Sequence, residues 1–292
     1  MLGSNSFIGK KIYQNLNISK NLNIFTINKY FDEDDIVFLN DRDFYKKYFI
    51  DIKKKIDCII NLIHIHKKNY DEEIDININL INKIIYFQNI KNSKIIYFSS
   101  VNSTESSGNK YSRSKFLIEK KIIKTNNYQI IRPSTVILEA DGHYLGGRKG
   151  SSLKIIYFLI RYSFFFPIIN NGNFLHTVCF LEDLQKFTYI SVTQDLFKNQ
   201  ITNFFSGEYI DYKQFVLFLA NKINKKVNFV NIPISFLLFF IKILEFCKIF
   251  EINVQMVDNL TSQKIEFDRT QKILKFFNLK KTNWLNDIKK KF

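Results

Sequence analysis

A tyrosine and a lysine stand four residues apart in the segment Tyr111–Lys115. On a helix this spacing places both side chains on one face. A nearby ammonium favours the phenolate, so we expect Lys115 to lower the pKa of Tyr111 and to make it a general acid and base. Ser99 and Ser100 end an apolar run just upstream and offer a hydroxyl for a substrate oxygen. These residue types predict proton exchange with a substrate hydroxyl while a hydride moves at the same carbon.

A glycine turn at the start of the chain is the second candidate element. Gly3 and Gly9 frame a turn that leads into a helix expected to begin near Phe7. Such glycines let backbone amides approach a pyrophosphate, and the helix N-terminus adds a favourable dipole. Ser6 stands where a middle glycine would be. Only two residues precede Gly3, so we expect the first strand of the sheet to be truncated.

Strand-like and helix-like segments alternate through the first half of the chain. Alternation of this kind predicts a parallel sheet with crossover helices, which binds ligands at the carboxyl ends of its strands. The expected strands are 23–28, 36–39, 58–63, 94–99 and 128–132, and the expected helices are 75–88 and 111–124. Farther on, we expect a loop over 141–152, a helix over 153–166 ended by Pro167, and an apolar helix over 234–250.

Composition excludes several classes of protein. With 292 residues, 46% of them hydrophobic, the chain can build a large core. Its formal net charge is +16, but the lysines are scattered and form no basic stripe, so nucleic-acid binding is disfavoured. The three cysteines lack metal-ligand spacing and no secretory signal is visible, so we expect a cytoplasmic protein. Charged residues interrupt 234–250, which favours a helix buried on the core over a membrane span.

Together, the motifs resemble those of the extended short-chain dehydrogenases, the NAD-dependent epimerase/dehydratase family. The resemblance covers nearly the whole chain in the right order. It rests on Gly-Ser-Asn-Ser-Phe-Ile-Gly (3–9), Ile-Ile-Tyr-Phe-Ser-Ser-Val (95–101), Tyr111 to Lys115 with Glu119, Ile-Arg-Pro-Ser-Thr-Val (131–136) and Val-Cys-Phe-Leu-Glu-Asp-Leu (178–184). It implies an α/β fold, a Rossmann-type doubly wound parallel sheet. The NAD(P)-binding domain would be mainly 1–166, and a smaller substrate-binding subdomain, interleaved with the sheet, mainly 167–292.

The resemblance also implies a role for each matching residue. Tyr111 would be the general acid and base, Lys115 would lower its pKa and hold a ribose, and Ser100 would be the catalytic hydroxyl. The cofactor-binding residues that it implies are Gly3, Ser6, Phe7, Ile8, Gly9, Asn28, Lys29, Asp41, Leu62, Ile63, His64, Asn77, Tyr111, Lys115 and Pro133.

The reaction that the resemblance implies is redox chemistry on a nucleotide-linked sugar. Dehydratases of the family carry an Asp-Glu pair after the catalytic hydroxyl, whereas Val101 and Asn102 follow Ser100 here. We therefore expect an epimerase or a keto-sugar reductase, working in surface polysaccharide biosynthesis. The partner would be a nucleotide-linked sugar, with no nucleic acid and no stable membrane insertion, and a homodimer is compatible with the resemblance.

The cofactor would be NAD or NADP, with a lean to NADP. An acid at the end of the second strand would repel a 2′-phosphate, but Asn28 stands at that position and Lys29 follows. No metal is expected, because His66, His143 and His176 form no recognisable ligand set and His64 fits a cofactor-lining loop better. Two other classes stay open: a non-catalytic dinucleotide-binding protein that kept the fold, and a membrane-peripheral oxidoreductase.

Overall fold

The chain folds into two compact units of α/β structure. The computed structural model describes residues 1–19, 21–24, 26, 55–67, 69–105, 110–137, 152–206, 210–236 and 239. One unit comprises residues 1–133 and 184–203, and the other comprises 134–183 and 204–292. The expected strand 36–39 and loop 141–151 lie outside the described residues, as does most of the expected helix 234–250. The role of 167–292 in substrate binding stays a prediction.

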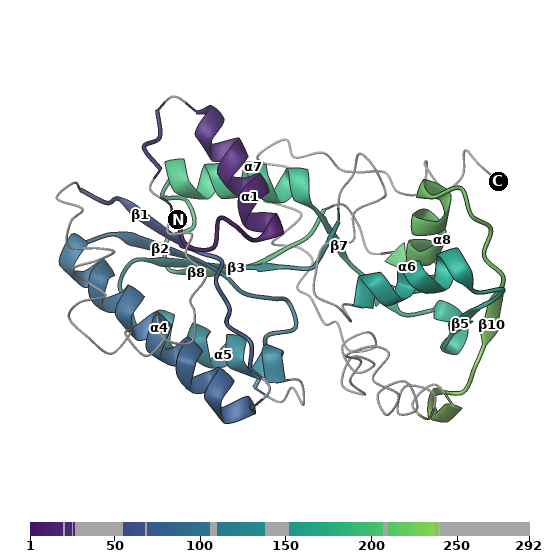
Figure 1. Ribbon diagram of the computed structural model, residues 1–292. Coiled ribbons are helices and arrows are strands. Elements are labelled where there is room, and N and C mark those ends of the chain that lie inside the picture. The colour runs from purple at the N-terminus through teal and green to yellow at the C-terminus, as the bar shows by residue number, and fades with distance from the viewer. Residues whose placement is uncertain are drawn as a thin grey trace. The chain divides into compact units, whose positions relative to one another are not determined.

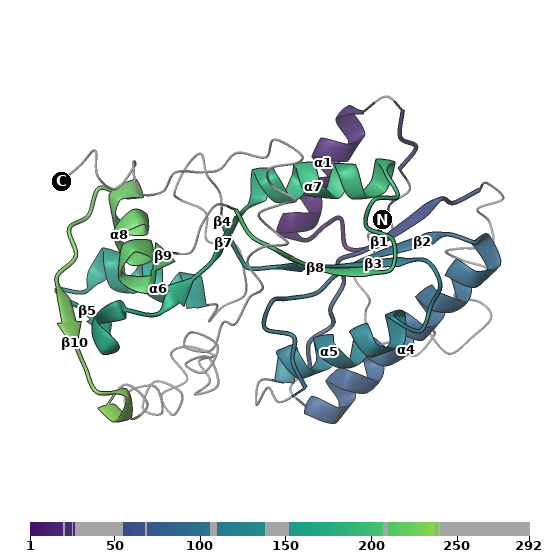
Figure 2. The same cartoon turned by 180° about the vertical axis from the view of Figure 1, so that it is seen from behind.

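The first unit is a four-stranded sheet covered by helices. Its strand order is β1-β2-β3-β8, formed by β1 (Cys58–Asn61), β2 (Lys94–Phe98), β3 (Tyr128–Pro133) and β8 (Gln200–Phe204). The pairs β1–β2 and β2–β3 are parallel. All five residues of β2 are buried, as expected for an apolar run covered on both faces. On one face lie α1 (Phe7–Ile18) and α7 (Leu181–Thr193), and on the other α4 (Tyr70–Lys91) and α5 (Lys110–Ile122) (Figures 1 and 2).

The segment before the glycine turn joins the sheet through a single residue. Leu2 forms a parallel bridge with Asn61, its N–H donates to the Ile60 carbonyl at 2.8 Å, and its own carbonyl accepts from Leu62 at 3.1 Å. The Leu2 side chain is buried among the core residues of the sheet. One residue in register therefore sets the glycine turn beside the loop that follows β1.

Two glycines make the turn into α1 sterically feasible. Gly3 has a φ of +83°, which disfavours a residue with a side chain. A Cβ on Gly9 would lie 2.1 Å from the Gly3 carbonyl oxygen. Ser6 caps the helix: its Oγ donates to the Gly3 carbonyl at 2.8 Å and accepts from the Gly9 N–H at 3.1 Å. The helix therefore begins at Phe7, as the sequence predicts.

Helix α4 is longer than expected because of its caps. Asn69 caps its N-terminus by accepting from the Asp71 N–H at 3.0 Å, and three acidic residues in the first turn favour the helix dipole. At the other end Asn92 adopts a left-handed conformation with φ of 51°. The capped helix runs from 70 to 91 instead of 75 to 88, which brings Glu73 into its first turn.

The second unit contains the remaining elements around its own apolar core. Strand β4 (Thr135–Ile137) pairs in parallel with β7 (Val178–Phe180), and β6 (Leu175–His176) pairs antiparallel with β9 (Ile210–Asp211). The unit also holds α6 (Ser152–Tyr162), α8 (Tyr212–Lys222) and the 3-10 turn η3 (Asn170–Gly172). No helix within the described residues is both long and apolar enough to cross a membrane.

The expectation that the helix after 152 reaches Phe166 is wrong. Helix α6 ends at Tyr162, and residues Phe166–Ile168 form strand β5, which pairs in parallel with β10 (Phe229–Asn231). The Phe166 N–H donates to the Asn228 carbonyl at 2.7 Å. A residue before proline is driven to extended backbone, which agrees with Phe166 in β5, but α6 already ends four residues before Phe166. A two-stranded sheet tolerates the missing N–H of Pro167.

The close approach at the glycine turn gives a first prediction. Exchanging glycine for alanine inside a helix normally stabilises it by about 1 kcal/mol. At Gly9 the added Cβ meets backbone, so we expect Gly9→Ala to lower the free energy of unfolding by about 1–3 kcal/mol. Urea denaturation measures this. The matched control is Lys10→Ala, an exposed neighbour on the same helix, expected within about 0.5 kcal/mol of the wild type. Equal stability of the two variants would rule out the close packing described.

Candidate active site

The carboxyl ends of β1 and β2 bring the predicted chemical residues to one edge of the sheet. The loop 62–67 follows β1, and the serines follow β2. Ser99 is buried, whereas Ser100 is partly exposed and its Oγ accepts from the Asn102 N–H at 3.3 Å. The Ser103 N–H donates to the Ser100 carbonyl at 3.0 Å, which closes a tight turn. Ser100 is thus the more exposed of the two serines, and its catalytic role stays a prediction.

Lys115 anchors α5 to the end of β2. Its Nζ donates to the Phe98 carbonyl at 2.7 Å, and the residue is only 2% exposed. The ammonium also lies 4.6 Å from the centroid of the Tyr97 ring and 5.7 Å from that of Tyr111. Burial lowers the pKa of Lys115 to about 7, although the negative charge of Glu119 acts in the opposite direction. The lysine can therefore exchange a proton near neutral pH.

Tyr111 lies against the loop that follows β1. Its ring meets His64 edge-on at 4.8 Å between centroids and stacks on His66 at 5.5 Å. Removal from water, and then the charge of Glu73, raise the pKa of Tyr111 to about 12. The expected lowering by Lys115 is thus wrong for this structure, because burial and then the charge of Glu73 raise the pKa of the phenol. The phenol of Tyr111 is therefore protonated at neutral pH.

The glycine turn and the loop after β1 pack together. A Cβ on Gly3 would lie 3.2 Å from atoms of Ile63 and 3.3 Å from Leu62. Asn61, at the end of β1, accepts from the Ile63 N–H at 2.9 Å and fixes the start of the loop. The structure therefore brings together Gly3, Leu62 and Ile63, which the sequence assigned to the same cofactor. Ser6, Phe7, Ile8 and Gly9 continue this turn into α1.

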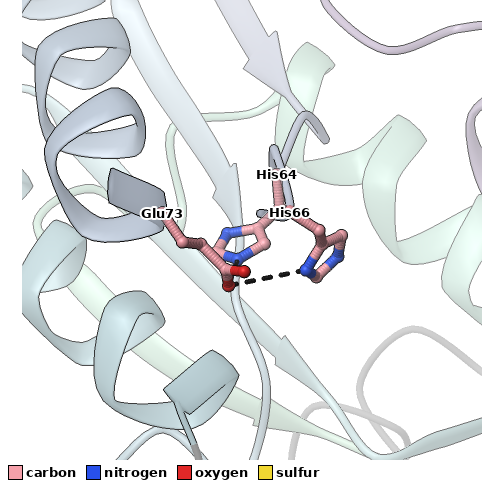
Figure 3. A group of neighbouring side chains, drawn as sticks. All are labelled: His64, His66 and Glu73. Carbon is pink, nitrogen blue, oxygen red and sulfur yellow. Dashed lines mark hydrogen bonds and ion pairs between the residues drawn. The ribbon is translucent and has the colours of Figure 1, made fainter. Parts of the chain in front are cut away.

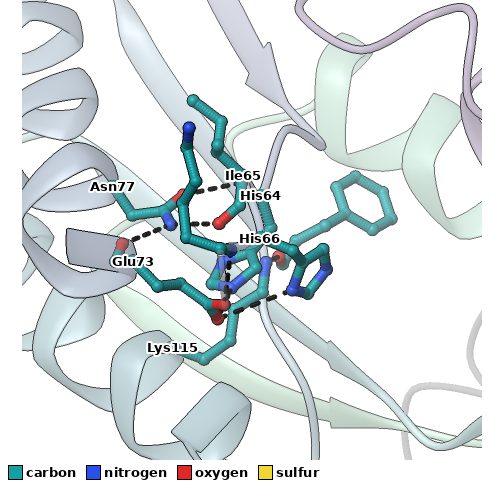
Figure 4. Close-up of polar contacts among 8 residues, drawn as sticks. His64, Ile65, His66, Glu73, Asn77 and Lys115 are labelled. Carbon is teal, nitrogen blue, oxygen red and sulfur yellow. Dashed lines mark hydrogen bonds and ion pairs between the residues drawn. The ribbon is translucent and has the colours of Figure 1, made fainter. Parts of the chain in front are cut away.

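Asn77 positions the loop from α4. Its Nδ2 donates to the Ile65 carbonyl at 2.6 Å and to the Glu73 carbonyl at 2.7 Å, and its Oδ1 accepts from the Ile65 N–H at 2.9 Å (Figure 4). The residue is 2% exposed. The sequence placed Asn77 on the cofactor side, but the structure engages its amide with the protein backbone. Its observed action is to hold Ile65, the residue between the two histidines of the loop.

Glu73 is the residue that sequence reasoning missed. Its Oε1 lies 3.1 Å from Nε2 of His64 and 3.5 Å from Nδ1 of His66 (Figure 3), and its Oε2 accepts from the Lys67 N–H at 3.0 Å. Within the described residues, His64, His66 and Glu73 form a group that could hold a metal ion, and the sequence did not indicate this grouping. The signal in the sequence was the run of three acids, Asp71 to Glu73, that follows the N-cap residue Asn69. On the helix this run places Glu73 beside the loop.

A buried ion pair braces α5 against β3. The carboxylate of Glu119 is 1% exposed and accepts two hydrogen bonds from Arg132: from Nε at 2.9 Å and from the guanidinium Nη2. Arg132 precedes Pro133, whose carbonyl accepts from the Val101 N–H at 3.3 Å. The Arg-Pro segment of the motif thus contacts both α5, through Glu119, and the turn after β2, through Val101. It helps to position these two elements.

Several expected residues lie elsewhere. Asn28, Lys29 and Asp41 are outside the described residues, as is His143. His176 belongs to the second unit, where it is buried against Phe215, and burial lowers its pKa to about 4. His176 is not part of the group formed by His64, His66 and Glu73.

Solved structures share this fold. The dTDP-4-dehydrorhamnose reductase from Bacillus anthracis, in complex with NADP, matches with a TM-score of 0.58 at 16% identity, over 80% of this chain and 82% of that chain. The ADP-L-glycero-D-manno-heptose-6-epimerase from Helicobacter pylori matches with a TM-score of 0.59 at 14% identity, over 80% and 83%. The UDP-glucose 4-epimerase from Thermotoga maritima, with UDP-glucose, matches with a TM-score of 0.55 at 12% identity, over 80% and 85%.

These matches establish the fold. No protein-family model matches the sequence, and no curated protein matches it. At identities of 12–16% a structural likeness speaks for architecture alone. It confirms the predicted α/β Rossmann-type architecture.

The burial of Lys115 generates a prediction about pH. Its folded-state pKa of about 7 lies below the ordinary 10.5, so between these values the unfolded chain holds a proton that the folded chain lacks. Stability therefore rises with pH across this window, by up to about 1.4 kcal/mol per pH unit. We expect the wild type to gain stability relative to Lys115→Met between pH 7 and 10, in chemical denaturation at each pH. Parallel stability curves for the two proteins would contradict the assignment.

Proposed function

We propose that the chain is an NAD(P)-dependent oxidoreductase or epimerase that acts on a nucleotide-linked sugar. The observation that carries this proposal is the placement of Tyr111 and Lys115 on α5 at the end of β2, with Ser100 on the adjoining turn. The fold is shared with a reductase solved with NADP and with epimerases named for sugar nucleotides. Fold alone does not define chemistry, so the proposal depends on these side chains.

The residues of the glycine turn fit a dinucleotide. The positive φ of Gly3 and the absence of a Cβ at Gly9 keep the turn narrow beside the first turn of α1. Helix N-termini of this kind bind phosphates through backbone N–H groups. Residues 3–9 would hold the diphosphate of the cofactor. The rest of the cofactor would contact Leu62, Ile63, His64, Lys115 and Pro133. The cofactor would be NAD or NADP, with a lean to NADP from the sequence at Asn28 and Lys29.

When bound, the nicotinamide supplies or accepts a hydride. The chain's own contribution is the proton. With its pKa raised to about 12, Tyr111 is protonated at neutral pH and can donate to a keto oxygen. Ser100 can hold the same oxygen through its hydroxyl. Lys115, with its pKa lowered to about 7, lies close enough to influence the charge that Tyr111 acquires after donation.

Two reaction types remain within the proposal. A keto-sugar reductase consumes one NAD(P)H for each product, whereas an epimerase returns the hydride to the other face and consumes none. Dehydration is disfavoured, because Val101 and Asn102 replace the acids that it needs. A panel of nucleotide-linked sugars with NADH and NADPH, read by mass spectrometry, separates the two. A role in surface polysaccharide synthesis and a homodimeric state are part of the same proposal.

Tyr111→Phe tests the role of the phenol. Removing the hydroxyl removes the proton donor but leaves the ring against the loop, so we expect turnover to fall by about two to four orders of magnitude while dinucleotide binding persists. Steady-state kinetics on the sugar identified by the panel measures the change. The matched control is Tyr86→Phe on α4, whose side chain is 56% exposed and which should retain full turnover. Near-normal turnover of Tyr111→Phe would remove Tyr111 from the mechanism.

A further inference from the structure

Two histidines and a glutamate converge beside Tyr111, and the proposed redox function uses only His64 among them, as a residue that lines the cofactor. His64 and His66 project from the loop after β1, and Glu73 from the first turn of α4 (Figure 3). Each residue offers one ligand atom, and these atoms all lie within 4.8 Å of one another. Within the described part of the chain this is the one group of at least three His, Cys, Asp or Glu side chains that meets that condition.

Two of the separations in the cluster, those that involve Glu73, suit a coordinated ion. Ligands at about 2.1 Å from a tetrahedral zinc lie about 3.4 Å apart. Glu73 Oε1 lies 3.1 Å from the nearer nitrogen of His64 and 3.5 Å from that of His66, on either side of this value. The two rings have centroids 4.5 Å apart. The His66 side chain is 25% exposed, so its ring has room to turn toward a shared ion.

Hydrogen bonds hold the cluster in place. Both backbone groups of Ile65, between the two histidines, are bonded to the side-chain amide of Asn77 (Figure 4). The Lys67 N–H donates a hydrogen bond to Oε2 of Glu73. The other oxygen, Oε1, is directed at the imidazoles. Outer hydrogen bonds that fix the orientation of ligands are a regular feature of metal sites and increase their affinity.

Burial adds an electrostatic reason for a cation. The Glu73 side chain is 7% exposed and that of His64 is 4% exposed, so the carboxylate has little water around it. A buried charge is stabilised by pairing or by coordination of a metal. Two neutral imidazoles and one carboxylate match the donor set of zinc sites that keep a fourth, open position.

We propose that His64, His66 and Glu73 bind one divalent transition-metal ion of the zinc class, with the fourth position left to water or to an oxygen of a bound ligand. The more exposed His66 marks the route of entry from solvent. Because both histidine rings contact Tyr111, the ion would lie beside the phenol. The proposal is independent of the redox function, since it concerns binding of the ion by these three side chains alone.

Titration of the full chain with metal tests the proposal. The protein is stripped with chelator, dialysed and titrated with Co²⁺, whose visible absorption reports ligation, and bound Zn²⁺ is counted by mass spectrometry. We expect one ion per chain and a rise in melting temperature. His66→Ala and Glu73→Gln should each weaken binding by at least about tenfold, as loss of a ligand exceeds the effect of an outer-shell change.

The matched control is Glu72→Gln, the same exchange one residue earlier on α4, at a side chain that is 50% exposed and pairs with Lys67. It should bind metal as the wild type does. Because Glu73 is buried, Glu73→Gln is compared only if circular dichroism shows that it folds. If it does not fold, the variant of the partly exposed His66, His66→Ala, decides the test alone. Failure of the wild type to bind Co²⁺ and Zn²⁺, or equal affinity of His66→Ala and the wild type, would overturn the proposal.

Discussion

The hydrogen bond from Lys115 to the Phe98 carbonyl fixes helix α5 on strand β2, and the candidate active site depends on it. An ammonium that is almost wholly buried needs a strong acceptor, and the last carbonyl of the strand provides one. One helical turn earlier, the same helix presents Tyr111 to the loop after β1. The pair Glu119–Arg132 secures the following turn of α5 to β3. A parallel sheet and one helix thereby set the position of the phenol.

The opposing side of the site is fixed from α4. Asn77 binds the loop through both backbone groups of Ile65, and Glu73, one turn earlier on the helix, reaches the two histidines. Burial raises the pKa of Tyr111, and the charge of Glu73 raises it further, so Glu73 couples the two sides of the site electrostatically. An ion held by the cluster would lie beside Tyr111, although its binding does not depend on the proposed redox function.

Local motifs were predictable from the sequence, whereas long-range electrostatics were not. The turn at Gly3 and the start of α1 rest on contacts between residues close in the sequence, so the glycine spacing predicted them, whereas the cap at Ser6 was not predicted. The pKa of Tyr111 is raised by burial and then by the charge of Glu73, and spacing along one helix shows neither of them. Glu73 was missed because its partners lie across a loop and become neighbours only after α4 is capped at Asn69.

The central claim is that this fold binds a nicotinamide dinucleotide at the glycine turn. Calorimetric titration of the full chain with NADP⁺ and with NAD⁺ tests it most directly. The account predicts saturable binding of one dinucleotide per chain, with NADP⁺ bound at least as tightly as NAD⁺. A preference for NAD⁺ would correct only the interpretation of Asn28 and Lys29. Absence of binding by both dinucleotides at millimolar concentration, in protein shown to be folded, would contradict the claim.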